Sequence, residues 1–369
     1  MVLPKTFSAH CVPSLYAWLN HHRTTVQGFY AKSSQTGGSL DVALALFAHP
    51  GSCLTAINLE NICMPTLYLL SVMTSITTCD LIAPSQQPLD LTPLAALSLL
   101  QSLLLQSGMF INIQALAHLT ELMLLNASAS AHMDCSFASG LRTLALDNAS
   151  IRGTHRDGLV ACRELQILSC HGSAVETSGV ELLSTHLKSA RFPASFSLLK
   201  SLSELRIGYK GPCTTGIFSN LSWTSQLRSL QVLSIASAVR VHVTDNLSKL
   251  TNLVTLILGS CEREQRVLAT IDVNWLCMPK LKILILLRCH LGLRASILGL
   301  VKHESLSCLV IKQCKPEGET TTSHFACLLY GLATQRPDTR LMIDRMDIWS
   351  RTRNFLAAVV SSAPNSCAA

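Results

Sequence analysis

Leucine recurs along this chain in a fixed frame, L-x-x-L-x-L-x-x-C, in which position nine is also occupied by small residues. The stretch 281–289, LKILILLRC, is a complete example, and the stretches that begin at Leu253 and Leu306 match it. Starts at residues 54, 76, 100, 119, 141 and 165 are separated by 22, 24, 19, 22 and 24 residues, and those at 230, 253, 281 and 306 by 23, 28 and 25. This rhythm indicates an internal repeat.

Within each repeat the frame predicts a strand and then a turn. Positions four and six place two apolar side chains on one face of a short strand, and position one packs beside them. Position nine lies where the chain turns inward, so a small side chain or a thiol fits there. The rest of each repeat returns over the outside, where residues 177–187 and 247–250 have helix-like leucine spacing. Because one repeat cannot bury its own leucines, neighbouring repeats must stack on one another.

Some repeats are irregular. The degenerate repeat at Ile76 has Ile76, Cys79 and Leu81 at positions one, four and six, and a weak repeat begins at Leu187. A first repeat is predicted at Val26, and Leu341 with Ile343 predicts a last strand. Polar stretches at 33–39, 84–93 and 315–323 are predicted to be loops inside the array.

The frame resembles that of leucine-rich-repeat proteins, and the match covers most of the chain. Cys261, Cys289 and Cys314 at position nine resemble the cysteine-containing subclass found in F-box substrate receptors of ubiquitin ligases, although no F-box is visible here. The resemblance implies an α/β fold: a leucine-rich-repeat solenoid, or horseshoe, with a parallel sheet on the concave face and helices or irregular segments on the convex face. It also implies substrate recognition in an SCF-type ubiquitin ligase.

The predicted organisation has three parts. Residues 1–25 form an N-terminal cap, residues 26–345 form the repeat array of about 11–13 units, and residues 346–369 form a C-terminal capping helix with a disordered tail.

Composition narrows the class of protein. The 369 residues are 49% hydrophobic and only 14% charged, which excludes a disordered chain, and the net charge of +7 is not clustered as in nucleic-acid-binding domains. Fifteen scattered cysteines without a CxxC pair fit buried thiols in a reducing compartment. No transmembrane helix or secretory signal is visible, and the four Asn-x-Ser sequons at Asn126, Asn148, Asn220 and Asn246 are close to chance. We therefore expect a cytoplasmic protein, with a cytoskeletal or ciliary place as the alternative.

Motifs for catalysis are absent from the sequence. There is no GxGxxG or Walker motif, and GYKGPCTTG at 208–216 is better explained as a turn than as a phosphate loop. The adjacent His21 and His22 are poorly placed for one metal ion, and a buried Cys289 beside His290 is not expected to act as a nucleophile. We predict no cofactor, no metal site and no enzymatic activity.

The strand face opposite the leucine core is the remaining candidate. Positions three, five and seven point to the concave side, and toward the C-terminal end they are apolar. The candidate partner-binding residues are Ile257, Ile283, Ile285, Leu287 and Val310, with Lys282, Arg288, Lys312 and Lys315 as a basic rim. Either a protein or peptide with an apolar centre and acidic edges docks there, or the C-terminal cap covers these residues.

These patterns favour a non-enzymatic, monomeric protein-binding scaffold. A structural component of the cytoskeleton or ciliary axoneme is one alternative, and a secreted or surface recognition module is another. We do not expect the protein to bind nucleic acid or to span a membrane.

Overall fold

The structure is a computed structural model in two compact units. It describes residues 24–32, 52–84, 87–130, 139–147, 150–152, 162–172, 199–209, 222–237, 241–243, 245–259, 267–293, 295–316, 318–336 and 338–344, with isolated positions between 14 and 48. The first unit contains the described residues up to Gly172, and the second contains those from Leu199 onward. The predicted caps at 1–25 and 346–369 lie largely or wholly outside the described residues and stay predictions.

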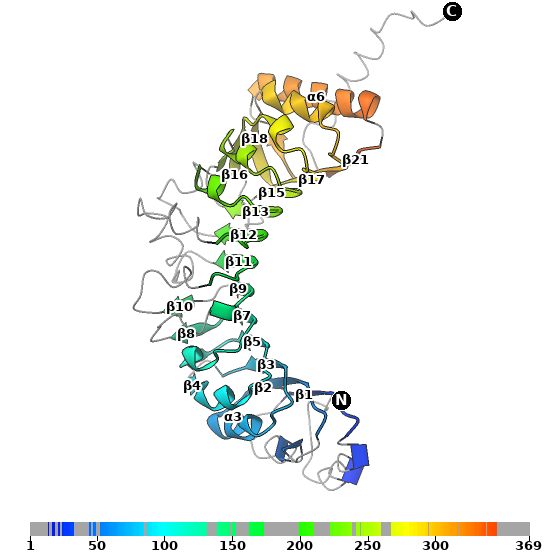
Figure 1. The fold of residues 1–369 in the computed structure, drawn as a ribbon. Helices are drawn as coiled ribbons and strands as arrows, with labels where there is room; N and C mark the ends of the chain where they lie inside the picture. Colours follow the sequence, from blue (N-terminus) through cyan, green and yellow to red (C-terminus); the bar gives the residue numbers. More distant parts are fainter. Residues whose placement is uncertain are drawn as a thin grey trace, which may run out of the picture. The chain divides into compact units, whose positions relative to one another are not determined.

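The first unit is a parallel sheet of seven described strands that follow one another in chain order (Figure 1). They are β1 (Gly28–Lys32), β2 (Ala56–Glu60), β3 (Thr78–Ile82), β5 (Ser102–Gln106), β7 (Glu121–Leu125), β9 (Thr143–Asp147) and β11 (Ile167–Gly172). A second, outer parallel sheet contains β4 (Pro88–Asp90), β6 (Met109–Ile111), β8 (Ser128–Ser130) and β10 (Ser150–Arg152). Helix α3 (Met64–Ser71) and the 3-10 helices η2 (Thr92–Ala96) and η3 (Ile113–Ala115) complete its connections.

The second unit repeats this plan with six described strands. They are β12 (Glu204–Tyr209), β13 (Val232–Ser237), β15 (Thr255–Gly259), β17 (Ile283–Leu287), β19 (Cys308–Lys312) and β21 (Arg340–Asp344). Its outer sheet contains β14 (Val241–Val243), β16 (Val267–Ile271), β18 (Cys289–Leu293) and β20 (Lys315–Pro316). The helical segments are η6 (Ser222–Gln226), η7 (Asp245–Lys249), η8 (Trp275–Cys277), η9 (Ala295–Lys302) and the longer α6 (Gly318–Gln335).

The strand pairs of the main sheet within each unit keep the register that the leucine frame predicts. Position four pairs with position four, as Leu256 does with Leu284 and Leu284 with Leu309. The described side chains at positions one, four and six are buried in the repeats from Val26 to Leu306, whereas Leu341 of the last strand is 36% exposed. Strand β17 alternates between buried and half-buried residues. The predicted leucine-rich-repeat solenoid, α/β with a parallel sheet, is confirmed, and so are the strands expected after Val26 and at Leu341–Ile343.

Two predicted loops were wrong. Residues 84–93 contain strand β4 and the start of η2, and residues 315–323 contain β20 and the first turns of α6. The return at 247–250 is part of the short 3-10 helix η7, whereas 33–39, 177–187 and Cys261 lie outside the described residues. Outer strands and 3-10 turns therefore supply most of the described returns.

Position eight of the frame has a conformation that the sequence analysis did not assign. The backbone there is left-handed in five repeats, with φ between 49° and 57°, at Asn61, Ser107, Asn126, Arg288 and Gln313. This conformation releases the amide for the next repeat, as when the N–H of Ser107 donates to the carbonyl of Leu125 at 2.9 Å. The inward turn therefore begins one residue before the small or thiol side chain at position nine.

Ser107 offers a test of this turn. A left-handed backbone costs an L-residue about 1–2 kcal/mol, so Ser107→Gly is expected to stabilise the protein by roughly 1 kcal/mol and Ser107→Val to destabilise it. The measurement is the free energy of unfolding in urea. Ser102→Val, in the extended strand β5, is the matched control and is expected to be tolerated. Equal losses for the two valine variants would contradict the left-handed assignment.

Candidate binding surface

The predicted apolar residues come together on the open face, by which we mean the face of the main sheet that carries positions three, five and seven. In the second unit, Ile257, Ile285, Val310 and Met342 are in register at position five of successive strands. Ile283 and Leu287 lie two residues to either side of Ile285 on β17. We call Ile257, Ile283, Ile285, Leu287 and Val310 the apolar patch.

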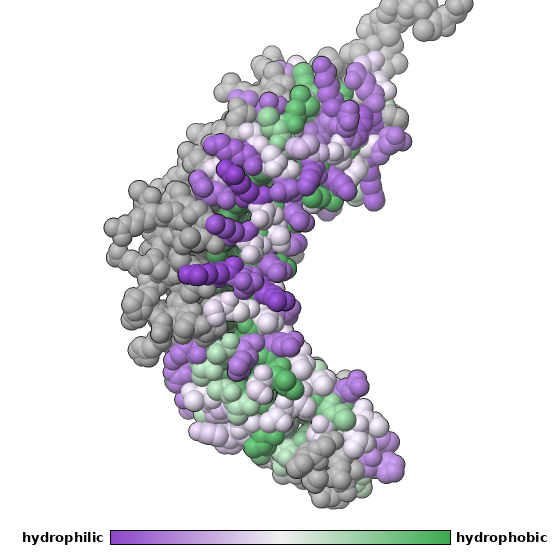
Figure 2. Space-filling view, in the orientation of Figure 1, coloured by the Kyte–Doolittle hydropathy of each residue, from purple (hydrophilic) through white to green (hydrophobic). Residues whose placement is uncertain are grey.

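All five side chains of the apolar patch are half-buried, and Met342 at its end is 45% exposed. In the orientation of Figure 1, the second unit carries small hydrophobic areas among hydrophilic side chains (Figure 2). Partly exposed apolar side chains in contiguous columns are typical of interaction sites. Met342 was not among the predicted residues, although it lies between Leu341 and Ile343 at positions four and six and is therefore at position five.

Glycine shapes one corner of this surface. A Cβ atom on Gly259 would lie 2.8 Å from the carbonyl oxygen of Leu287 and 2.9 Å from its Cβ. These distances are shorter than van der Waals contact, so a side chain is excluded there. The position-seven column therefore has no side chain on β15, and Leu287 packs directly over the backbone of that strand.

The predicted basic rim is only partly reproduced. Lys282 at position two and Lys312 at position seven are exposed, and Lys312 is in register with Asp344. Arg288 is half-buried at the left-handed position eight, and its Nε donates to Oε1 of Gln313 at 3.1 Å. Arg288 thus takes part in the turn at the carboxyl end of β17.

One predicted rim residue was misplaced, and one was missed. Lys315 belongs to β20 in the outer sheet, where it pairs with His290, so it is not on the open face. Arg340 occupies position three of β21 and is exposed on the open face. With Leu341 at position four of the frame, Arg340 could have been placed at position three from the sequence.

Two position-nine cysteines, Cys289 and Cys314, are structural. Cys289 Sγ lies 3.2 Å from the carbonyl oxygen of Leu287, and Cys314 Sγ lies 3.4 Å from that of Leu286 in the preceding repeat. The backbone N–H of Cys289 in turn donates to Cys314 Sγ at 3.5 Å. The hydrogen bond with Cys314 and burial raise the pKa of Cys289, so its reactive thiolate is disfavoured.

The open face of the first unit carries a polar cluster on β1, β2, β3 and β5, beside the exposed Met123 of β7. Tyr30 OH donates to Oε1 of Glu60 at 2.8 Å, while the amides of Asn58 and Gln106 donate to the two carboxylate oxygens of Asp80. Desolvation, and to a lesser extent the charge of Glu60, raise the pKa of Asp80. Asp80 lies at position five of the degenerate repeat at Ile76, and that degeneracy hid it from the leucine frame.

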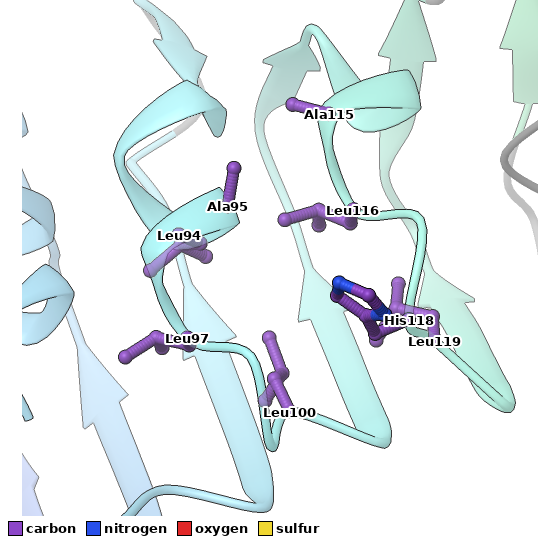
Figure 3. A pocket seen from close by; sticks show the side chains of 8 residues that line it. All are labelled: Leu94, Ala95, Leu97, Leu100, Ala115, Leu116, His118 and Leu119. Carbon is purple, nitrogen blue, oxygen red and sulfur yellow. The ribbon is translucent and has the colours of Figure 1, made fainter. Parts of the chain in front are cut away.

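Outside the open faces, the first unit has a shallow pocket lined by the turns around η2 and η3 (Figure 3). Its walls are leucine and alanine side chains with His118, and its cavity volume is about 10 Å³. That is room for about one water molecule, too little for a substrate or cofactor. Within the described residues, no group of three or more histidine, cysteine or acidic side chains is arranged to hold a metal ion.

Comparison with known proteins gives distant structural likenesses. No family model matches the chain, and no curated protein matches it either. An internalin from Listeria monocytogenes is 12% identical, with 82% of this chain and 94% of that chain covered and a TM-score of 0.42. A leucine-rich-repeat protein from Leptospira interrogans is 13% identical, with 92% and 93% covered and a TM-score of 0.43.

The mouse RP105/MD-1 complex gives a TM-score of 0.48 at 13% identity, with 88% of this chain and 60% of that chain covered. At these identities and TM-scores, the likenesses do not specify a function. A search of the described helices finds none that is long and apolar enough to cross a membrane.

Proposed function

We propose that this chain is a non-enzymatic protein-binding scaffold that contacts its partner through the apolar patch. The observation that carries the proposal is the in-register column of Ile257, Ile285 and Val310 on an open sheet face. Half-buried apolar side chains spread over several strands suit a protein surface better than a small molecule, which needs an enclosing pocket. The buried, protonated thiol of Cys289 supports a role without catalysis.

Ile285→Glu tests this proposal. A carboxylate in the middle of the patch must be desolvated when a partner docks, so a partner recovered by affinity purification from native cells is expected to be lost. Lys312→Glu is expected to weaken recovery through the charge at the edge of the patch.

Met123→Glu is the matched control, because Met123 occupies the same position five in β7 of the first unit and is 37% exposed. Recovery of the same partners with Ile285→Glu and with the wild type would overturn the proposal. Val310→Thr removes apolar surface with little change of shape, so it gives a second test should Ile285→Glu lower the melting temperature.

The ubiquitin-ligase hypothesis is a finer form of this function. It is motivated by cysteine at position nine, where Cys289 and Cys314 make thiol-to-carbonyl contacts. Co-purification of a cullin adaptor is the expected result, and a clean alternative partner without an adaptor would exclude this form.

The same material tests the compartment. We infer a cytoplasmic scaffold. A salt-resistant pellet would instead support the cytoskeletal or ciliary alternative, and glycan at the sequons would support a secreted or surface module.

A further inference from the structure

We propose that the apolar patch accepts an amphipathic α-helix of a partner protein, which lies across the strands and carries carboxylates along its flanks. This inference rests on the proposed function and names the shape and charge of the partner. It follows from the spacing of the position-five column, from the charges beside that column and from the charges of residues 345–369.

The spacing of the column fits a helix better than an extended peptide. Ile257, Ile285, Val310 and Met342 are in register on four successive strands. Neighbouring strands are about 4.8 Å apart, so the column is about 14 Å long. Four apolar side chains at i, i+4, i+7 and i+11 of a helix span about 16 Å. Four alternate side chains of an extended peptide span about 20 Å, so they fall out of step with the column.

The width of the surface also suits a helix. Positions three and seven lie about 7 Å on either side of position five, so the three columns span about 14 Å, which accommodates a helix about 10–12 Å in diameter. On β17 these columns are Ile283, Ile285 and Leu287, and Leu287 also covers the backbone of β15 at Gly259.

The charges beside the columns favour an acidic partner. At positions two, three, five and seven of β13 to β21, the charged residues are Lys282, Lys312 and Arg340 against Asp344 alone. Lys282 and Arg340 lie toward the amino ends of the strands, and Lys312 lies at the carboxyl end of β19. Carboxylates on the flank of a helix toward the amino ends of the strands would therefore meet cations, and on the other flank a carboxylate over β19 would meet Lys312, which has Asp344 as its neighbour.

Charge also argues that the occupant is a partner protein and not the C-terminal segment of this chain, residues 345–369. Residues 345–369 contain three arginines and one aspartate. Such a segment has the same sign of charge as the rim, and like charges oppose docking. The apolar stretch 355–360 within it makes it the natural competitor, so it enters the test as a probe of its own.

The test uses the full chain and four fluorescent synthetic peptides of about 16 residues each. The first is a helix with leucines at i, i+4, i+7 and i+11 and glutamates on its flanks. The second has lysines in place of the glutamates, the third has a central proline, and the fourth is residues 345–360 of this chain. Binding is followed by fluorescence anisotropy at two salt concentrations.

The glutamate helix is expected to bind. The lysine and proline peptides are expected to bind at least about tenfold more weakly, because they lack the complementary charge or the helical spacing. Ile285→Glu in the protein should weaken the glutamate helix by a similar factor, Met123→Glu should leave it unchanged, and added salt should weaken it.

Equal binding of the proline and glutamate peptides would overturn the helical shape, and equal binding of the lysine peptide would overturn the acidic flanks. Tighter binding of residues 345–360 than of the glutamate helix would identify this chain's own segment as the occupant and overturn the proposal. If no peptide binds while Ile285→Glu still abolishes recovery of cellular partners, the helix inference fails and the proposed function stands. If those partners survive Ile285→Glu, the proposed function itself fails.

Discussion

Leu284→Ala is expected to destabilise the protein by about 2–5 kcal/mol, whereas Ile285→Ala, one residue further along β17, is expected to cost about 1 kcal/mol or less. Leu284 is fully buried between its equivalents Leu256 and Leu309, so its truncation leaves a cavity in the stacked core. Ile285 is half-buried on the open face, so solvent fills the space that its truncation leaves.

The free energy of unfolding in urea measures both changes. Leu256→Ala and Ile257→Ala on β15 form a matched pair, because they occupy the same two positions of the neighbouring repeat. The two leucine variants should lose stability together, and the two isoleucine variants should remain close to the wild type. Similar losses for Leu284→Ala and Ile285→Ala would place both side chains in the core and contradict the register.

The alternation of these two residues explains why the main sheet was predictable. A strand has a side-chain period of two, so the leucines of the frame define one face and the intervening residues define the other. The regular step between repeats then places equivalent residues side by side, which brings Ile257, Ile285 and Val310 together. The core and the apolar patch both follow from this periodicity.

The outer layer was harder to predict, because its signals are short or delayed. Strand β4 begins with Pro88, which suggests a loop, but β4 is an edge strand of its sheet, and proline is tolerated at edges. Helix α6 begins with polar residues, and its buried Phe325, Leu328, Leu329 and Leu332 follow only two turns later. The polar residues of the first two turns therefore concealed the helical period of α6.

Details of the turns and the rim depend on three-dimensional pairing. The left-handed position eight is occupied by asparagine in two repeats and by serine, arginine and glutamine in the others, so residue type alone does not indicate it. Arg340 was overlooked because its strand was recognised only by Leu341 and Ile343. Asp80 was overlooked because its repeat lacks the first leucine of the frame.

Arg336→Ala is the second substitution for which a large loss is expected. The guanidinium of Arg336 follows the end of α6 and donates to the backbone carbonyls of His303, Glu304 and Leu306, the last two at 2.8 and 3.0 Å. These carbonyls belong to the turn between η9 and β19, so the side chain of Arg336 links the end of α6 to the segment that precedes β19. Loss of several charge-assisted hydrogen bonds is expected to destabilise the protein by about 2–4 kcal/mol.

Arg336→Lys separates charge from geometry. A lysine ammonium lacks the planar fork that reaches several carbonyls at once, so it should recover only part of the stability. Arg340→Ala, at an exposed arginine on β21, is the matched control and should change stability by less than about 0.5 kcal/mol. Urea unfolding gives the free energies, and hydrogen exchange at the amide of Leu306, which donates to the carbonyl of His303, reports on the turn directly. Equal stability of Arg336→Ala and Arg340→Ala would show that the guanidinium does not hold α6 against the turn before β19.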